Sequence, residues 1–304
     1  MSFKNYISNL IIFGFSLLFV RTFPYYVDYL REEVQNTLLY IYFAYLILAP
    51  IYYYFVKTET NKSVLIIQYL RKLLTWNIHT TKEEKTAILF LLVKLFFTPL
   101  MLQFFFQNFH HVKFLLNHFN WFGFALTSIF MIDTFIFGFA YLIELKFLNN
   151  IVKSVEPTFL GWFVAIICYP PFNWLIGDHI EWGANDYATF GIYTNFVRVL
   201  IIFLILIYLS ATFSLGAKAS NLTNRGIVTK FPYSIIRHPA YVSKNLMWWI
   251  TLIPVMSWKF AIGMFFWSFI YYLRAYTEER HLSQDQDYIT YKEKIKYKFI
   301  PYIY

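Results

Sequence analysis

Residues 237–241 read Arg-His-Pro-Ala-Tyr, and they open an apolar stretch that ends about thirty residues later at Arg274, Glu278 and Glu279. The stretch is interrupted only near residues 258–259. An α-helix rises about 1.5 Å per residue, so two passes of about sixteen to eighteen residues would each cross roughly one hydrocarbon core. We therefore expect a helical hairpin that leaves and re-enters the same membrane face, with both polar clusters at that face.

The composition of the whole chain is that of a membrane protein. Hydrophobic residues make up 59% of the 304, and charged residues only 14%, whereas soluble domains carry about 25% charged residues. The first apolar run, residues 6–20, ends in Arg-Thr-Phe-Pro rather than in small residues, so we expect no cleavable signal peptide. The single cysteine, Cys168, excludes an internal disulfide and CxxC-type metal or redox sites, and we expect no metal.

Hydropathy predicts an all-α polytopic membrane helix bundle with about eight transmembrane helices. The expected spans are residues 6–20, 34–56, 87–107, 121–143, 159–177, 196–215, 243–257 and 260–276. The fifth span contains Pro170-Pro171, which remove two backbone donors and break the helix. Residues 57–86 mix apolar and basic side chains, which is typical of an amphipathic helix at the cytoplasmic interface.

The distribution of Lys and Arg predicts the orientation. Twenty of them lie on the side of the two termini, and four lie on the other side, at Arg21, Arg31, Lys113 and Lys259. This asymmetry places both termini in the cytoplasm, in a bacterial inner membrane or the endoplasmic reticulum. The net charge of +9 comes largely from loops beside apolar spans, so the basic residues indicate a membrane and not nucleic acid.

Two charged residues fall inside the expected spans, Lys94 and Asp133. Isolated charges at that depth are costly. We therefore expect these two side chains to face each other or a polar cavity, most simply as a structural pair.

The two polar clusters of the C-terminal hairpin contain groups that suit binding of a charged ligand. Pro239 suits the first turn of a helix, whose start offers free backbone N–H groups and a positive dipole end to an anion. Arg274 and Glu278 are four residues apart and share one helix face, whereas Glu279 turns about 100° away. A cation and an anion opposite His238 would suit a zwitterionic ligand with a further cationic centre. Taken singly, each residue is equally consistent with a positively charged loop and a helical ion pair.

At these residues the sequence resembles the isoprenylcysteine carboxyl methyltransferase family and the related phospholipid methyltransferases. The family pattern is Gly-x-Tyr, then Arg-His-Pro-x-Tyr-x-Gly, a hydrophobic hairpin, and Glu-Glu-x-x-Leu followed by Tyr-x-x-Tyr. It appears here as Pro232-Tyr233, residues 237–241, residues 278–282 and residues 288–291. Phe231 stands in place of the first glycine and could narrow the loop over the ligand; Ser243 replaces the later glycine.

The resemblance covers roughly residues 215–304. We therefore divide the chain into an N-terminal transmembrane region, residues 1–215, and a methyltransferase-like cofactor-binding region, residues 216–304. The family implies S-adenosylmethionine bound without a Rossmann domain, and the chain has no Gly-x-Gly-x-x-Gly. The implied partners are the lipid bilayer and a hydrophobic or lipidated methyl acceptor, such as the carboxylate of isoprenylcysteine.

The resemblance also implies roles for individual residues. Arg274 would orient the acceptor carboxylate, and Arg274 and His238 are the expected catalytic residues. The implied cofactor contacts are Arg225, Gly226, Ile227, Val228, Tyr233, His238, Pro239, Ala240, Tyr241, Glu278 and Glu279.

Two alternative functions are compatible with this architecture. A membrane reductase of the sterol-reductase type would bind NADPH, whose phosphates would need more arginines, and Glu278-Glu279 is a poor neighbour for them. A non-catalytic membrane scaffold could retain the same fold.

Overall fold

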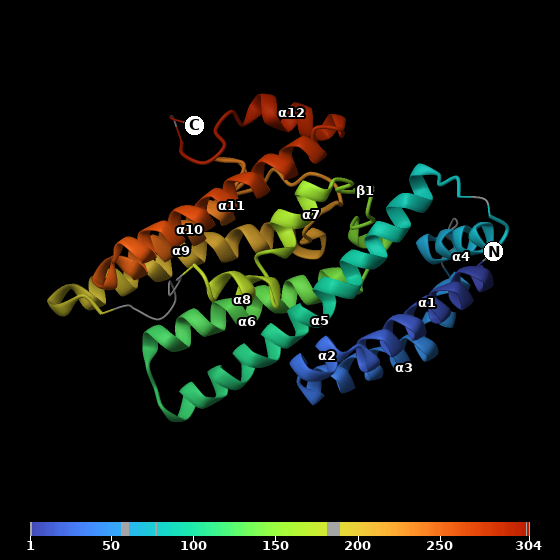
Figure 1. The fold of residues 1–304 in the computed structure, drawn as a ribbon, viewed down its shortest axis with the longest axis horizontal. Coiled ribbons are helices and arrows are strands. Elements are labelled where there is room, and N and C mark those ends of the chain that lie inside the picture. Colours follow the sequence, from blue (N-terminus) through green and yellow to red (C-terminus); the bar gives the residue numbers. More distant parts are fainter. Residues whose placement is uncertain (1, 56–60, 77, 181–188, 302, 304) are drawn as a thin grey trace. The chain divides into compact units, whose positions relative to one another are not determined.

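The computed structural model describes residues 2–55, 61–76, 78–180, 189–301 and 303 of the chain. The described part is almost entirely helical, which confirms the predicted all-α fold (Figure 1). Its elements are α1 (Ser2–Thr22), α2 (Pro24–Tyr29), α3 (Glu32–Phe55), α4 (Lys62–Leu74), α5 (Lys82–Asn117), α6 (Trp121–Leu142), η1 (Lys146–Leu148), β1 (Ser154–Val155), α7 (Phe159–Ile166), α8 (Phe172–Gly177), η2 (Gly191–Tyr193), α9 (Thr194–Leu215), η3 (Gly216–Lys218), β2 (Thr223–Asn224), α10 (Pro239–Leu252), η4 (Ile253–Val255), α11 (Trp258–Leu282) and α12 (Gln286–Lys294).

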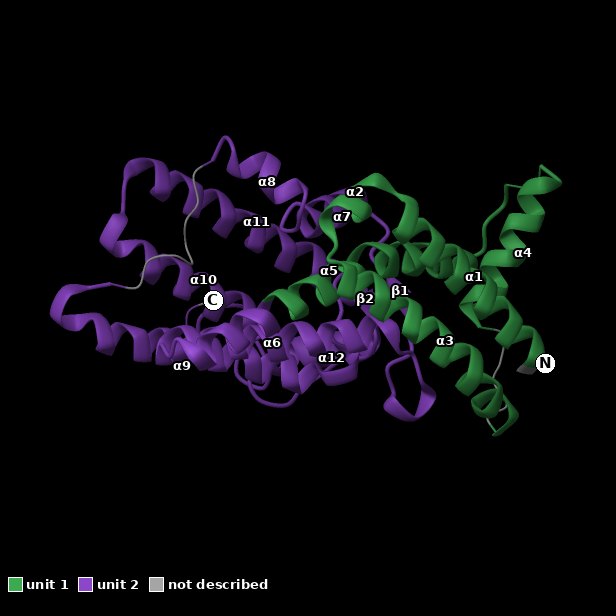
Figure 2. Cartoon of the chain, turned by 90° about the horizontal axis from the view of Figure 1, so that it is seen from below, with its two compact units in different colours: residues 1–107 green, residues 108–304 purple. Residues whose placement is uncertain are grey.

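The chain divides into two compact units, residues 1–107 and residues 108–304 (Figure 2). The earlier division at residue 215 rests on motifs, and it stays a prediction about function.

In the first unit, α1 packs against α3 and α4. Its core consists of Leu17, Val20, Tyr26, Leu30, Val34 and Leu38. Tyr26 donates its hydroxyl hydrogen to the Leu95 carbonyl at 2.8 Å, which ties α2 to α5. The expected amphipathic segment contains α4, whose N-cap, Asn61, accepts the Val64 N–H at 3.0 Å.

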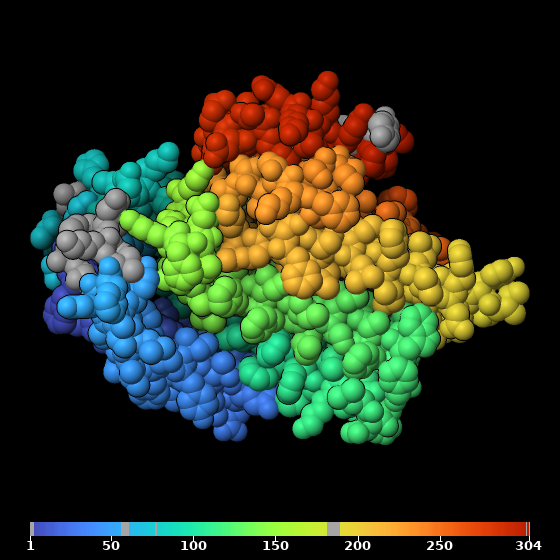
Figure 3. Space-filling view, turned by 180° about the vertical axis from the view of Figure 1, so that it is seen from behind, coloured from blue at the N-terminus to red at the C-terminus, as the bar shows by residue number. Residues whose placement is uncertain are grey.

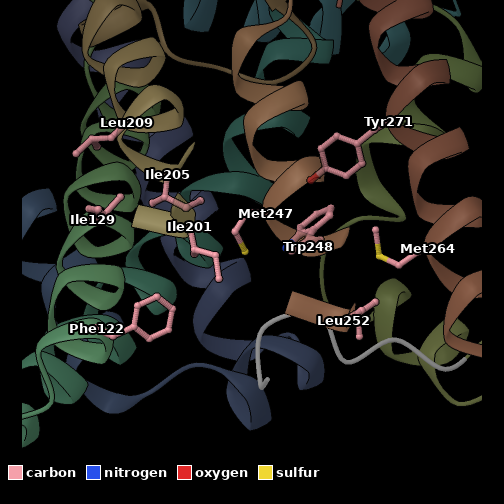
Figure 4. Packing of buried hydrophobic residues seen from close by; sticks show 10 residues of the cluster. All are labelled: Phe122, Ile129, Ile201, Ile205, Leu209, Met247, Trp248, Leu252, Met264 and Tyr271. Carbon is pink, nitrogen blue, oxygen red and sulfur yellow. The ribbon is translucent and has the colours of Figure 1, made fainter. Parts of the chain in front are cut away.

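In the second unit, α9 packs between α6 and α10, and α11 contacts α7 and α10. The side chains of four helices form its main core (Figure 4): Phe122, Ile129, Ile201, Ile205, Leu209, Met247, Trp248, Leu252, Met264 and Tyr271. This core packs α10 and α11 together along their apolar parts, away from the polar start of α10 and the polar end of α11.

Five helical segments in the described part of the chain are long and apolar enough to cross a membrane. They are Phe3–Thr22, Glu32–Phe55, Lys82–Asn117, Trp121–Leu142 and Gly191–Lys218. The expected count of eight is not confirmed. The predicted span 159–177 consists of two short helices, α7 and α8, because Pro170 and Pro171 interrupt it. With 14 residues, α10 is about 21 Å long, less than the roughly 30 Å of a hydrocarbon core.

Candidate active site

The start of α10 is paired with the C-terminal segment. His238 is the N-cap and Pro239 the first helical residue, as the motif predicts. The backbone N–H groups of Arg237 and His238 donate to the carbonyls of Tyr297 and Lys298 at 3.0 and 3.1 Å. Figure 3 shows this C-terminal segment (red) lying against the orange residues that lead into α10. The loop that opens the motif is therefore fixed from the far end of the chain.

Tyr241, Arg274 and Glu278 come together where α10 and α11 meet. The Tyr241 hydroxyl donates to Glu278 Oε2 at 2.7 Å. The Arg274 guanidinium carbon lies 5.3 Å from the centroid of the Tyr241 ring, a cation–π contact, and its Nη2 donates to Asn221 Oδ1 at 2.9 Å. Arg274 and Glu278 thus share Tyr241 as a neighbour, as their helical spacing predicts.

A cleft lies beside these three residues, with a cavity volume of about 50 Å³. One face of α11 lines it with Arg274, Thr277, Glu278, His281 and Leu282. Across from that face lie Glu156, Gly161, Val164, Ala165, Ser220, Asn221, Leu222, Thr223 and Tyr241. The cleft is therefore polar along α11 and partly apolar along α7.

Glu279 belongs to a separate ion cluster. Its Oε1 accepts from Arg237 Nε at 2.8 Å and lies 2.9 Å from His238 Nε2, and its Oε2 lies 3.8 Å from Lys298 Nζ. Burial alone would raise the pKa of Glu279, but the hydrogen bonds from His238 and Arg237 outweigh it and lower the pKa to about 2. The two adjacent glutamates therefore have different partners: Glu278 faces the cleft and Glu279 holds the C-terminal segment.

His238 links these two groups. Its ring stacks on the Tyr241 ring with centroids 5.4 Å apart and planes 7° apart, while its Nε2 is engaged with Glu279. His238 and Glu279 are not among the described residues that line the cleft. Their roles as direct cofactor contacts stay predictions, and the structure makes His238 a positioning neighbour of Tyr241.

The loop around Arg225 is fixed by internal contacts. The Arg225 side chain is buried and donates from Nη1 to the Ala140 carbonyl at 2.7 Å; this burial lowers the pKa of its guanidinium. Gly226 has φ = +93°, a conformation that favours glycine, and its N–H donates to Asn224 Oδ1 at 2.8 Å. Neither these two residues nor Ile227 and Val228 line the described cleft.

The remaining motif positions lie around the same loop. The Tyr233 carbonyl accepts the Tyr291 hydroxyl hydrogen at 2.8 Å, so the two tyrosine motifs meet. The Phe231 side chain is 57% exposed and does not line the cleft. Its expected effect on the loop over the ligand stays a prediction. Ser243 bonds back to the Pro239 carbonyl at 2.8 Å inside α10.

The motifs did not point to residues 153–158, yet this segment brings Glu156 to the cleft. Antiparallel β1 and β2 pair Ser154 with Asn224 and Val155 with Thr223. Ser154 Oγ lies 2.9 Å from His281 Nε2, and Arg280 Nη2 donates to Glu156 Oε1 at 2.9 Å. The only sequence signal was Glu-Pro-Thr just before an apolar run, where Thr158 caps α7 and Glu156 is a charged residue beside a span.

A second buried polar group lies deeper in the same unit. Asp133 on α6 accepts the hydroxyl hydrogens of Tyr208 at 2.7 Å and Thr212 at 2.6 Å, both on α9. The ammonium of Lys244 on α10 lies 5.3 Å from the Tyr208 ring centroid. Asp133 thus has polar surroundings, as expected, while its pairing with Lys94 stays a prediction.

Comparison with known proteins fits this geometry. The family model described as phospholipid methyltransferase matches residues 187–285, which include α9, α10, α11 and both motif clusters. The match confirms, over this segment, the resemblance to the isoprenylcysteine/phospholipid methyltransferase family. No curated protein gives a significant match. The family and the apolar helices together indicate an integral membrane protein of the methyltransferase class.

Proposed function

We propose that this protein is an S-adenosylmethionine-dependent methyltransferase that acts on a membrane-embedded or lipid-modified acceptor. The observation that carries the proposal is the group of Tyr241, Arg274 and Glu278 in one cleft at the end of the α10–α11 hairpin. Proteins of the matched family generally use this cofactor.

The residues of the cleft fit such a cofactor. The Glu278 carboxylate is bonded by a neutral tyrosine hydroxyl, so it keeps a negative charge for the ammonium of the methionyl group. The first turn of α10 provides backbone N–H groups that suit the methionyl carboxylate. When bound, S-adenosylmethionine supplies an electrophilic methyl group. A cleft of about 50 Å³ is far smaller than the roughly 300–1,000 Å³ of ordinary ligand pockets, so binding requires the lining side chains to move.

Under this proposal, Arg274 would hold the acceptor. Its planar guanidinium can bind a carboxylate through two parallel hydrogen bonds, as an isoprenylcysteine acceptor would require. A carboxylate is already ionised at pH 7 and needs no general base, so catalysis would rest on alignment and on exclusion of water. The acceptor's apolar tail would lie among the apolar helices, within the bilayer.

The direct test is a binding measurement on the purified protein in detergent. We expect saturable binding of S-adenosylhomocysteine by calorimetry and none of NADPH. Binding of NADPH instead would favour a reductase, and binding of neither would favour a non-catalytic scaffold.

The acceptor class is tested by Arg274→Lys, which keeps the positive charge but loses the planar guanidinium that can form two parallel hydrogen bonds. With a carboxylate acceptor, we expect S-adenosylhomocysteine affinity within about twofold of wild type and at least a tenfold loss of methyl transfer. Unchanged transfer to a phospholipid amine would contradict the carboxylate assignment.

A further inference from the structure

Glu156 is a buried carboxylate with one oxygen that no described residue bonds. The residue is 2% exposed. Its Oε1 accepts from the Thr158 N–H at 3.0 Å and from Arg280 Nη2 at 2.9 Å. Its Oε2 is buried and has no hydrogen-bond partner in the described part of the chain. Buried polar atoms are nearly always satisfied, so an unbonded oxygen on a carboxylate residue that lines the cleft requires an explanation.

Gly161 makes room for this carboxylate. A Cβ atom at Gly161 would lie 2.3 Å from Glu156 Cγ and 2.6 Å from its Cδ. The N–H of the same glycine donates to Thr158 Oγ1 at 3.2 Å, which caps α7. The first turn of α7 therefore holds Glu156 in its place, and any side chain at position 161 would displace it.

The charges at the two carboxylates of the cleft differ. Glu156 is already paired with the Arg280 guanidinium, so its net charge is balanced. Glu278 is bonded by the neutral Tyr241 hydroxyl and retains its charge. A cationic group is therefore favoured at Glu278, whereas Glu156 Oε2 needs only a neutral N–H or O–H donor.

We propose that Glu156 Oε2 accepts a hydrogen bond from a neutral donor on the nucleoside part of the ligand, either a ribose hydroxyl or the adenine amino group. This assignment rests on the proposed function and extends it. It gives the cleft a binding residue from outside the motif-bearing region, in the connection between α6 and α7.

Calorimetry with S-adenosylhomocysteine on wild type and Glu156→Gln makes the first test. We expect affinity to fall roughly tenfold to a hundredfold, because a hydrogen bond to a charged acceptor is lost. The matched control is Asp287→Asn, which removes a carboxylate that pairs with Lys153 outside the cleft and should leave affinity unchanged. Gly161→Ala keeps the Glu156 charge but displaces the side chain, and it should weaken binding to a similar extent.

Ligand analogues identify the donor without any substitution. In the wild type, S-adenosylhomocysteine analogues lacking the 2′-hydroxyl, the 3′-hydroxyl or the adenine amino group are compared with the parent compound. One analogue should bind wild type roughly tenfold or more weakly than the parent compound does. The same analogue should bind Glu156→Gln as tightly as the parent compound does, because the hydrogen bond is already lost in that variant.

Three results would overturn the proposal. If Glu156→Gln binds the parent as tightly as wild type does, Glu156 is not a ligand contact, and the proposed function stands. If all three analogues bind wild type like the parent, no neutral nucleoside donor is bonded. If wild type binds no S-adenosylhomocysteine at all, the proposed function itself is wrong.

Discussion

At the scale of single residues, the adjacent glutamates of α11 have different surroundings. Glu278 accepts from Tyr241 at the cleft, and Glu279 is bonded by Arg237 and His238 beneath the C-terminal segment. A helix turns about 100° per residue, so neighbours in sequence face different partners. The motif therefore combines a carboxylate that lines the cleft with one that bonds to Arg237 and His238.

We expect the two glutamine substitutions to separate these roles. Glu278→Gln should lower S-adenosylhomocysteine affinity roughly tenfold to a hundredfold with little change in thermal stability, since it removes the charge opposite the ammonium. Glu279→Gln should instead destabilise the protein by about 3 kcal/mol, because it leaves Arg237 as a buried charge without its counter-ion. Calorimetry and thermal unfolding of both variants in the same detergent make the comparison. Equal losses of stability in the two variants would contradict the division of roles.

The sequence predicted that Tyr241, Arg274 and Glu278 lie together, but it did not predict their tertiary partners. Helical periodicity places Arg274 and Glu278 on one face without any knowledge of the fold. Glu156 and Asn221 reach the same cleft through tertiary contacts, which no local spacing encodes. For the same reason, the motif could not predict that Arg225 donates to the Ala140 carbonyl, and its role as a cofactor contact stays a prediction.

At the scale of elements, the C-terminal segment is attached to the start of α10 by charge and backbone pairing together. Arg237 donates from Nη1 to the carbonyls of Ile295 and Lys296, at 2.9 and 2.8 Å, as well as to Glu279. We therefore expect the attachment to depend in part on an ionised Glu279.

This attachment should weaken in acid. The folded-state pKa of Glu279 is about 2, below its ordinary value of 4.5, so the unfolded chain binds a proton first as the pH falls. The stabilisation is complete above about pH 4.5 and is lost as the pH falls through 2. Thermal unfolding of wild type and Glu279→Gln, measured between pH 7 and pH 2, should show a constant difference above pH 4.5 that shrinks below it. A difference that is independent of pH would exclude ionised Glu279 as the cause.

A second element-scale prediction concerns the contact of α6 with α9. Asp133→Ala removes the acceptor of the Tyr208 and Thr212 hydroxyls, and it should destabilise the protein by about 2–4 kcal/mol. Asp133→Asn keeps one acceptor oxygen and should cost clearly less. Thermal unfolding would decide it. The coupling of Asp133 with Lys94 is tested by the double variant. A loss of stability smaller than the sum of the two single losses would show that the charges are coupled, whereas additive losses would show that they are independent.

At the scale of the whole molecule, the number of membrane crossings decides the orientation of the two ends. Asn221, just beyond α9, donates its N–H to the Tyr141 hydroxyl at the end of α6, so both helices end on the cleft side. β1 also lies there, because it pairs with β2. Since α9 runs back toward the cleft and is about 33 Å long, we expect the chain to return across the membrane between residues 155 and 194. We expect the broken segment of α7 and α8 to make that crossing, which a membrane tolerates where protein surrounds the break.

We therefore expect eight crossings: α1, α3, α5, α6, the broken segment, α9, α10 and α11. An even number would place both termini on one side, and the excess of Lys and Arg there predicts that this side is cytoplasmic. We therefore expect reporter fusions before residue 1 and after residue 304 to report the cytoplasm. Fusions in the 118–120 loop and in the 178–195 loop, part of which lies outside the described residues, should report the opposite side. If the fusion after residue 304 reports the opposite side while the N-terminal fusion reports the cytoplasm, the broken segment does not cross, and the cleft would open away from the cytoplasmic supply of its water-soluble cofactor.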